Sequence, residues 1–184
     1  FESQASASRL IALLSLFSLA GMFMVLYVHF KSANLALQVM VSIPLAFIGA
    51  VIGVWLSGGV FSIATMVGFV TLTGIAARNG IMMIAHYIHL MEHEGEKFDL
   101  SMVYRGTSER IIPVLMTALT ASLALIPLVI AADEPGRELL HPVAVVIFCG
   151  LFSSTLLDLT VRPLVFWKFG KKPISTLLPQ AITQ

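Results

Sequence analysis

Charged side chains are scarce in this sequence, since only 11% of its 184 residues are Asp, Glu, Lys or Arg. A soluble globular domain carries about 25%, whereas here 58% of the residues are hydrophobic and the mean hydropathy is +0.94. The scarcity excludes an ordinary soluble domain and indicates an integral membrane protein. The net charge is only +1 and the basic residues are dispersed at the ends of apolar stretches. The sequence therefore offers no basic patch for a nucleic-acid partner.

Cysteine is nearly absent as well. The single Cys149 lies in an apolar run, which excludes a disulfide within the chain. The sequence also lacks a nucleophile beside a base, a phosphate-binding loop and a closed set of zinc ligands, so we predict no enzyme activity and no cofactor. It begins at Phe1 and has no signal-peptide pattern, and we expect it to be internal to a longer polypeptide.

Long apolar runs are what the sequence has in abundance. Five of them match the ~20 residues that a helix needs to cross the hydrocarbon core of a bilayer. They predict an all-α integral membrane domain of five transmembrane helices within residues 10–169. The predicted spans are Leu10–Val28, Leu35–Leu56, Ile63–Leu90, Ile111–Ala132 and Pro142–Trp167.

The longest connection between spans, residues 92–110, contains a further helical pattern. Asp99 is a good N-cap residue, and Leu100, Val103 and Tyr104 follow it at i, i+3, i+4 spacing. This spacing predicts a short interfacial helix near residues 99–108. The tail, residues 170–184, has no core-forming pattern, and we expect it to be disordered.

The basic residues also predict how the domain is oriented in the membrane. Eight of them fall on one side of the predicted spans and only two, Arg9 and Arg137, on the other. Because cytoplasmic loops carry the excess of Lys and Arg, the eight predict a cytoplasmic C-terminus. They are Lys31, Lys97, Arg105, Arg110, Arg162, Lys168, Lys171 and Lys172.

Arg78 is the most informative residue, because it lies near the middle of the third predicted span. A guanidinium stays protonated there, and an intramembrane charge marks a functional site by default. Asn79 beside it can donate or accept hydrogen bonds. Arg78 either neutralises a buried carboxylate or takes part in an ion-linked cycle by holding a carboxylate ionised. On a helix with 100° of rotation per residue, Arg78 shares one face with Thr71, Gly74, Met82, Ala85 and His89. We call this face the Arg78 stripe and expect it to face an interior cleft.

Asp158 is the only carboxylate within a predicted span. It could meet Arg78, since Asp158 lies 16 residues beyond Pro142, Arg78 lies 16 residues beyond Ser62, and the two helices run in the same direction. It could equally pair with Arg162, four residues later on its own helix. We favour the local pair, which leaves Arg78 needing a carboxylate that this chain does not contain.

Two further polar groups are candidates. Arg110 and Thr117 lie seven residues apart on one face of the fourth span. The hydroxyl groups of that span, including that of Thr117, either donate hydrogen bonds to carbonyls of their own helix or line a proton path. His86 and His89, with Met82 one turn away, are weak candidates for soft-metal ligands because no third ligand converges on them.

Three motifs carry a resemblance to a known family. They are Gly74-Ile75-Ala76-Ala77-Arg78-Asn79-Gly80-Ile81, Arg110-Ile111-Ile112-Pro113-Val114-Leu115-Met116-Thr117-Ala118 and Ile126-Pro127-Leu128. In this order they resemble the C-terminal membrane half of resistance-nodulation-division (RND) efflux permeases. The segments 140–144 and 153–157 are most similar to the heavy-metal efflux branch. Many metal exporters, however, carry a carboxylate at the position of Arg78.

The resemblance implies that the five helices are the last five of twelve and that residues 1–9 end a periplasmic porter domain. It places Arg78 where drug exporters have a lysine that pairs with aspartates, and Arg110 and Thr117 at proton-relay positions. It further implies a homotrimeric proton antiporter of the bacterial inner membrane, exporting metal cations or small toxic compounds with a periplasmic adaptor and an outer-membrane channel. Two alternatives are an RND-like component for protein secretion or lipid transport, and a self-contained five-helix scaffold or channel.

Overall fold

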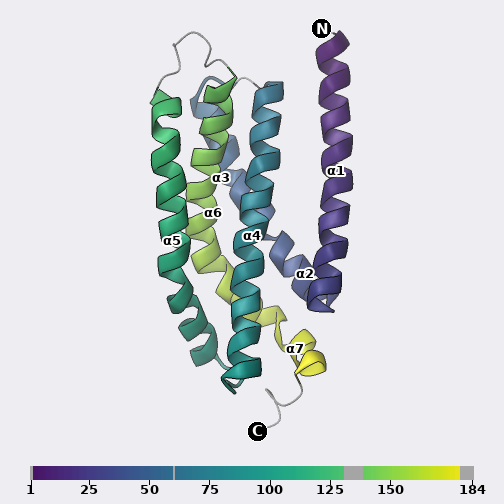
Figure 1. Ribbon diagram of the computed structural model, residues 1–184, viewed down its shortest axis with the longest axis vertical. Helices are drawn as coiled ribbons and strands as arrows, with labels where there is room; N and C mark the ends of the chain where they lie inside the picture. The colour runs from purple at the N-terminus through teal and green to yellow at the C-terminus, as the bar shows by residue number, and fades with distance from the viewer. Residues whose placement is uncertain (1, 60, 131–138, 179–184) are drawn as a thin grey trace.

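The structure, a computed structural model, describes residues 2–59, 61–130 and 139–178 and consists of helices within those ranges (Figure 1). Five stretches are long and apolar enough to cross a membrane, as predicted: Ala7–Phe30, Ala33–Leu56, Ile63–His93, Leu100–Ile130 and Leu140–Phe169. Successive stretches run in opposite directions along the bundle (Figure 1). The helices are α1 (Glu2–Phe30), α2 (Ala33–Met40), α3 (Ser42–Leu56), α4 (Ile63–His93), α5 (Leu100–Ile130), α6 (Leu140–Phe169) and α7 (Lys171–Leu177).

The second predicted span is divided into α2 and α3 at Val41. Pro44 has no N–H to donate to the carbonyl of Met40, so the regular hydrogen-bond ladder is interrupted there. The Ser42 hydroxyl donates instead to the Val39 carbonyl at 2.7 Å. The break therefore lies beside a buried polar side chain, that of Ser42.

The prediction of a separate interfacial helix near residues 99–108 is wrong, because these residues form the first turns of the continuous helix α5. No glycine or proline separates residue 108 from the span. The Arg105 guanidinium also donates to Glu109 one turn later, at 2.9 Å, across the expected boundary.

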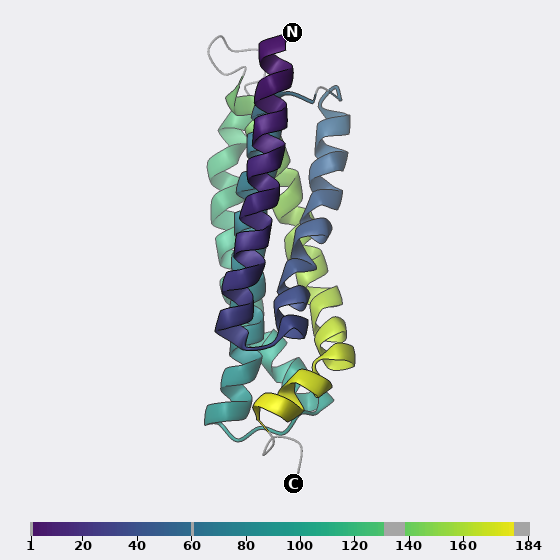
Figure 2. The same ribbon diagram turned by 90° about the vertical axis from the view of Figure 1, so that its right-hand side faces the viewer.

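The tail prediction is wrong for residues 171–177, which form α7. Ile174 is fully buried and packs in one apolar cluster with Phe166 and Leu35, and this tertiary burial stabilises a segment too short to be helical alone. In Figure 2, α7 lies across the end of the bundle near the turn between α1 and α2. Residues 179–184 lie outside the described residues.

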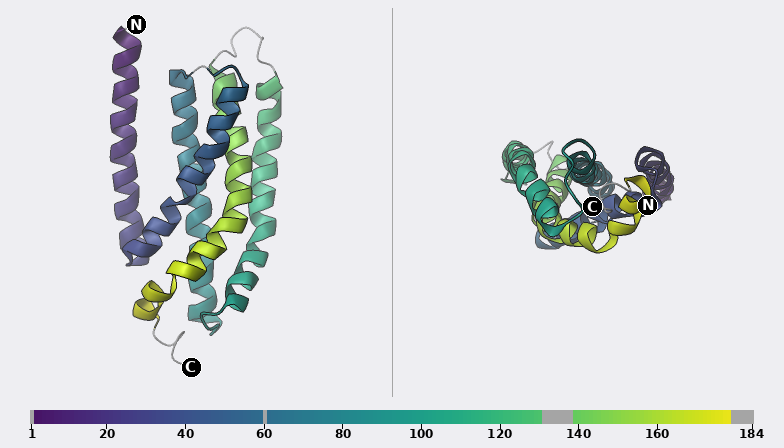
Figure 3. Two further views of the ribbon diagram at one scale, coloured as in Figure 1. Left: turned by 180° about the vertical axis from the view of Figure 1, so that it is seen from behind. Right: turned by 90° about the horizontal axis from the view of Figure 1, so that it is seen from below.

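Helices α3, α4 and α6 form the closely packed centre of the bundle. A Cβ atom added to Gly53 would lie 2.7 Å from the Cys149 side chain, and one on Gly68 would lie 2.9 Å from Val146. Small residues thus let the backbones approach closely. Helix α1 stands apart (Figures 1 and 3), with only 6% of its apolar window buried. An apolar groove of about 650 Å³ separates it from α3 and α4.

Candidate functional site

An ion pair is buried near the middle of α6. Asp158 Oδ1 lies 2.6 Å from Arg162 Nη2, and both side chains are only 4% exposed. Ser154 donates a hydrogen bond to the other carboxylate oxygen at 3.1 Å, and the guanidinium donates to the Ser42 hydroxyl on α3. The structure therefore forms the local pair that we favoured over a pair between Arg78 and Asp158.

Gly80 on α4 makes room for this guanidinium. A Cβ atom at Gly80 would lie 2.5 Å from Arg162 Nη1 and 3.0 Å from Ser42 Oγ. Three helices thus meet around Arg162: its own, α3 through Ser42, and α4 through Gly80. Sequence reasoning missed Ser42 and Gly80, because both lie far from Arg162 in the chain.

The polar cluster extends to Gln38 on α2. In the described part of the chain Gln38 Oε1, Arg162 Nε and Arg162 Nη1 are buried without a hydrogen-bond partner. Gln38, Ser42, Asp158 and Arg162 line a small cavity of about 10 Å³. That volume is close to the smallest that accommodates one water molecule. A water there would link the unpaired acceptor to the unpaired donors and would complete the hydrogen bonding of the cluster.

Arg78 lies on the opposite side of α4 from Gly80, because two residues rotate a helix by about 200°. It is exposed, fifteen residues from each end of α4, whereas the neighbouring Asn79 is buried. No ion pair of Arg78 occurs within residues 2–59, 61–130 and 139–178. The prediction that the Arg78 stripe faces an interior cleft is wrong for the bundle of this chain: Thr71, Arg78, Met82 and His89 all face outward.

Arg110 and Thr117 both lie on α5 and do not join the buried pair. The Thr117 hydroxyl donates to the Val114 carbonyl of its own helix at 2.9 Å, as does the Thr120 hydroxyl to the Met116 carbonyl at 2.8 Å. Of the two outcomes foreseen for these hydroxyls, bonding within the helix is the one that the structure forms. Arg110 is half-buried, and its Nε has no partner among the described residues.

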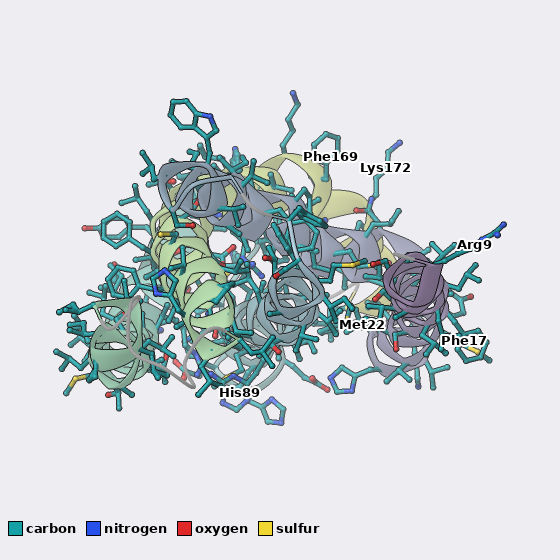
Figure 4. All side chains as sticks on the ribbon, turned by 90° about the horizontal axis from the view of Figure 1, so that it is seen from above. Arg9, Phe17, Met22, His89, Phe169 and Lys172 are labelled. Carbon is teal, nitrogen blue, oxygen red and sulfur yellow. The ribbon has the colours of Figure 1, made fainter. Side chains whose placement is uncertain are left out.

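The predicted metal ligands do not converge. His86 lies 2.9 Å from Glu109 on α5, whereas the His89 ring stacks on His93 at a centroid distance of 4.6 Å. In Figure 4, His89 points away from the bundle. Met82 is exposed, and the described ranges contain no group of three His, Cys, Asp or Glu side chains placed to hold a metal ion.

A network of charges does link the ends of α4 and α5. Arg105 contacts Glu94 at 2.5 Å, Glu96 at 2.6 Å and Glu109 at 2.9 Å. His86 contacts the second oxygen of Glu109 and so connects α4 to the same network. Among the described residues this is the largest group of paired charges, and it spans the connection between α4 and α5.

Comparisons with known proteins agree with this architecture. The chain is 37% identical over 166 residues to the cobalt-zinc-cadmium resistance protein CzcA of Cupriavidus metallidurans, covering 90% of this chain and 15% of that protein. It is 39% identical over 138 residues to the nickel and cobalt resistance protein CnrA of the same organism, covering 75% and 12%. Its identity to the multidrug resistance protein MdtC of Escherichia coli is 29% over 167 residues, covering 87% and 16%.

The fold is also that of a solved transporter. A crystal structure of a heavy metal efflux pump superposes with a TM-score of 0.82 and 34% identity, covering 93% of this chain and 17% of that one. The chain therefore spans about one sixth of the relatives that it matches. The model of the AcrB/AcrD/AcrF family matches residues 1–170, and the chain belongs to this family of RND permeases, which are multi-pass membrane transporters.

Proposed function

We propose that this chain supplies five membrane helices of a proton-driven RND efflux transporter that exports metal cations or small toxic compounds. The metal-resistance names of CzcA and CnrA and the multidrug-resistance name of MdtC support both substrate classes. The family is one of transporters, so no covalent catalysis is required of the chain. The observation that carries the coupling part of the proposal is the outward-facing Arg78.

In this mechanism Arg78 pairs with carboxylates on a part of the transporter outside this chain. The carboxylate of Asp158 on α6 contacts Arg162 at 2.6 Å, so it is not the partner of Arg78. A guanidinium does not titrate at working pH, and Arg78 therefore acts as the fixed charge. Protonation of its partner carboxylates weakens their attraction to Arg78, and α4 then moves relative to the rest of the transporter.

The other candidate residues have supporting roles in the proposal. Asn79, buried on the inner side of α4, couples the movement of Arg78 to the Asp158–Arg162 cluster. On α5, Thr117 is exposed and Arg110 is half-buried, and a further helix of the transporter packed beside them can complete a proton relay. Thr117 would then exchange its bond to Val114 for a bond to water.

The proposed setting is the bacterial inner membrane, with the C-terminus in the cytoplasm. The excess of Lys and Arg at one end of the bundle supports this orientation. Residues 1–9, which the resemblance assigns to the end of a periplasmic porter domain, overlap the first turns of α1, since this helix begins at Glu2; the porter domain would therefore lead directly into α1. The whole transporter would be a homotrimer that works with a periplasmic adaptor and an outer-membrane channel, as the family resemblance implies.

The test is substrate uptake into inverted membrane vesicles that contain the intact transporter. With a proton gradient imposed, Arg78→Ala should abolish uptake of Zn²⁺, Co²⁺ or a cationic dye, whereas Arg78→Lys should keep part of it because it keeps the charge. Lys31→Gln, which removes a basic residue outside the spanning helices, is the matched control. Unchanged proton-driven uptake by Arg78→Ala would show that the assigned role is wrong.

A further inference from the structure

A pocket of mixed aromatic and basic character lies where α6 turns into α7. It has a volume of about 520 Å³ and is lined by Phe98, Leu164, Trp167, Lys168 and Lys171. We call it the α6–α7 pocket. None of its lining residues belongs to the buried ion pair or to the stripe of Arg78, so the transport mechanism leaves it unused.

Helical geometry brings these side chains together. Relative to Leu164, the residues Trp167, Lys168 and Lys171 are at i+3, i+4 and i+7, which is one face of a helix. That face continues from α6 into α7 because the two helices are separated only by Gly170. Leu164, at the deeper end, is 66% exposed, so an apolar surface leads directly to the two lysines.

The aromatic wall of the pocket is fixed in place. The Trp167 ring stacks on Phe98 with an interplanar angle of 2° and a centroid distance of 5.5 Å. The Phe98 ring also lies beside the ring of the fully buried Phe166, with the two ring centroids 5.8 Å apart. Trp167 lies two residues before the end of the last spanning helix, at the depth where tryptophan is enriched in membrane proteins.

The charge of this region is positive. Lys168, Lys171 and Lys172 are exposed within five residues of one another, and Figure 4 shows Phe169 and Lys172 projecting from the same side of the bundle. Two carboxylates, Glu96 and Asp99, line a neighbouring pocket that also includes Lys171. Glu96 contacts Arg105 at 2.6 Å, and Asp99 accepts a hydrogen bond from Ser101 at 3.1 Å. Neither lines the α6–α7 pocket.

We propose that the α6–α7 pocket is a binding site for an anionic phospholipid. Lys168 and Lys171 bind the headgroup phosphate, and Trp167 and Leu164 pack against the glycerol and the first part of an acyl chain. Basic clusters at the end of a spanning helix attract anionic lipids, and lysines there extend along apolar surface while keeping the ammonium at the headgroup level. The inference is independent of the transported substrate and of the role of Arg78.

Native mass spectrometry of the full chain in a nonionic detergent tests the site. Phosphatidylglycerol and phosphatidylcholine with identical acyl chains are titrated separately. We expect one molecule of phosphatidylglycerol to bind per chain, with an affinity several-fold higher than that of phosphatidylcholine. The variant Lys168→Gln/Lys171→Gln should weaken that binding by roughly fivefold for each lysine, since a lysine near an anionic surface contributes ~1 kcal/mol. Lys168→Arg/Lys171→Arg should retain the preference, and Lys31→Gln, at the same end of the bundle, should leave it unchanged.

Three results would overturn the proposal. The first is equal binding of the two lipids, and the second is a preference that survives Lys168→Gln/Lys171→Gln. The third is displacement of phosphatidylglycerol by equimolar glycerol phosphate, which would identify a site for soluble phosphate instead. Thermal unfolding of each variant accompanies the titration. Trp167→Ala should lower the affinity for both lipids by a similar factor, because the substitution removes an apolar contact and leaves the charge of the lysines unchanged.

Discussion

Arg162 and Arg78 flank the same part of α4, yet they have opposite surroundings. Arg162 lies against Gly80 and contacts Asp158 at 2.6 Å with its side chain 4% exposed. Arg78, two residues before Gly80, is exposed and makes no ion pair among the described residues. The comparison shows that two arginines within membrane helices of one bundle can differ completely in burial and in ion pairing. Arg162 has a carboxylate one turn away and is buried with it, whereas Arg78 is exposed on the outside of the described helices.

The largest expected effect comes from breaking the buried pair. Asp158→Ala leaves the Arg162 guanidinium buried without its counter-charge, which should lower the free energy of unfolding by about 3–5 kcal/mol. Thermal unfolding of the chain in detergent, followed by circular dichroism, measures the loss. Asp158→Leu/Arg162→Met removes both charges and should regain most of the stability. If the double variant is no more stable than Asp158→Ala, the charge of Arg162 is not the cause.

Closing the space beside Arg162 should have the next largest effect. A methyl group in Gly80→Ala would lie 2.5 Å from Arg162 Nη1, so the guanidinium or α4 must shift, at about 1–3 kcal/mol. Gly74→Ala is the matched control on the same helix, because no atom lies within 4 Å of the added Cβ there. Equal melting temperatures for the two variants would contradict the close approach of Arg162 to α4.

Arg78→Ala should barely change the stability of this chain. Since Arg78 is exposed and lacks an ion pair among the described residues, the expected change in the free energy of unfolding is within about 0.5 kcal/mol. The same melting experiment measures it beside Asp158→Ala. A loss as large as that of Asp158→Ala would mean that the two arginines are equally structural, and the comparison would fail.

Thr117→Val should have the smallest effect. The hydroxyl bonds only to the Val114 carbonyl of its own helix, and the valine is nearly isosteric, so the chain should melt within about 0.5 kcal/mol of the unsubstituted protein. In the intact transporter the same variant separates stability from function. A normal melting profile with reduced proton-driven uptake is the expected outcome for a relay residue, and normal uptake would remove Thr117 from the relay.

Several features of the fold could be predicted because their causes are local. Asp158 and Arg162 are one helical turn apart, so their pairing followed from i, i+4 geometry. Ser62 caps α4, accepting a hydrogen bond from the Thr65 N–H at 3.2 Å, and the predicted third span begins at the next residue. In contrast, two expectations were wrong. The expected interfacial helix is part of α5, because nothing in the local sequence ends a helix between residues 108 and 111. The expected disordered tail forms α7, because Ile174 is buried against residues that are distant in the sequence.

By itself the sequence determined that five helices cross the membrane, because each apolar run must satisfy its own backbone hydrogen bonds in lipid. It also determined that a permanently charged guanidinium stands at the middle of the third helix. Only the tertiary structure decided which side of α4 is inside the bundle. Gly80 and Ser42 admit Arg162 on one side, and the close packing of α3, α4 and α6 leaves Arg78 on the other. Packing is a property of surfaces brought together from distant parts of the chain, so no single stretch of sequence contained that decision.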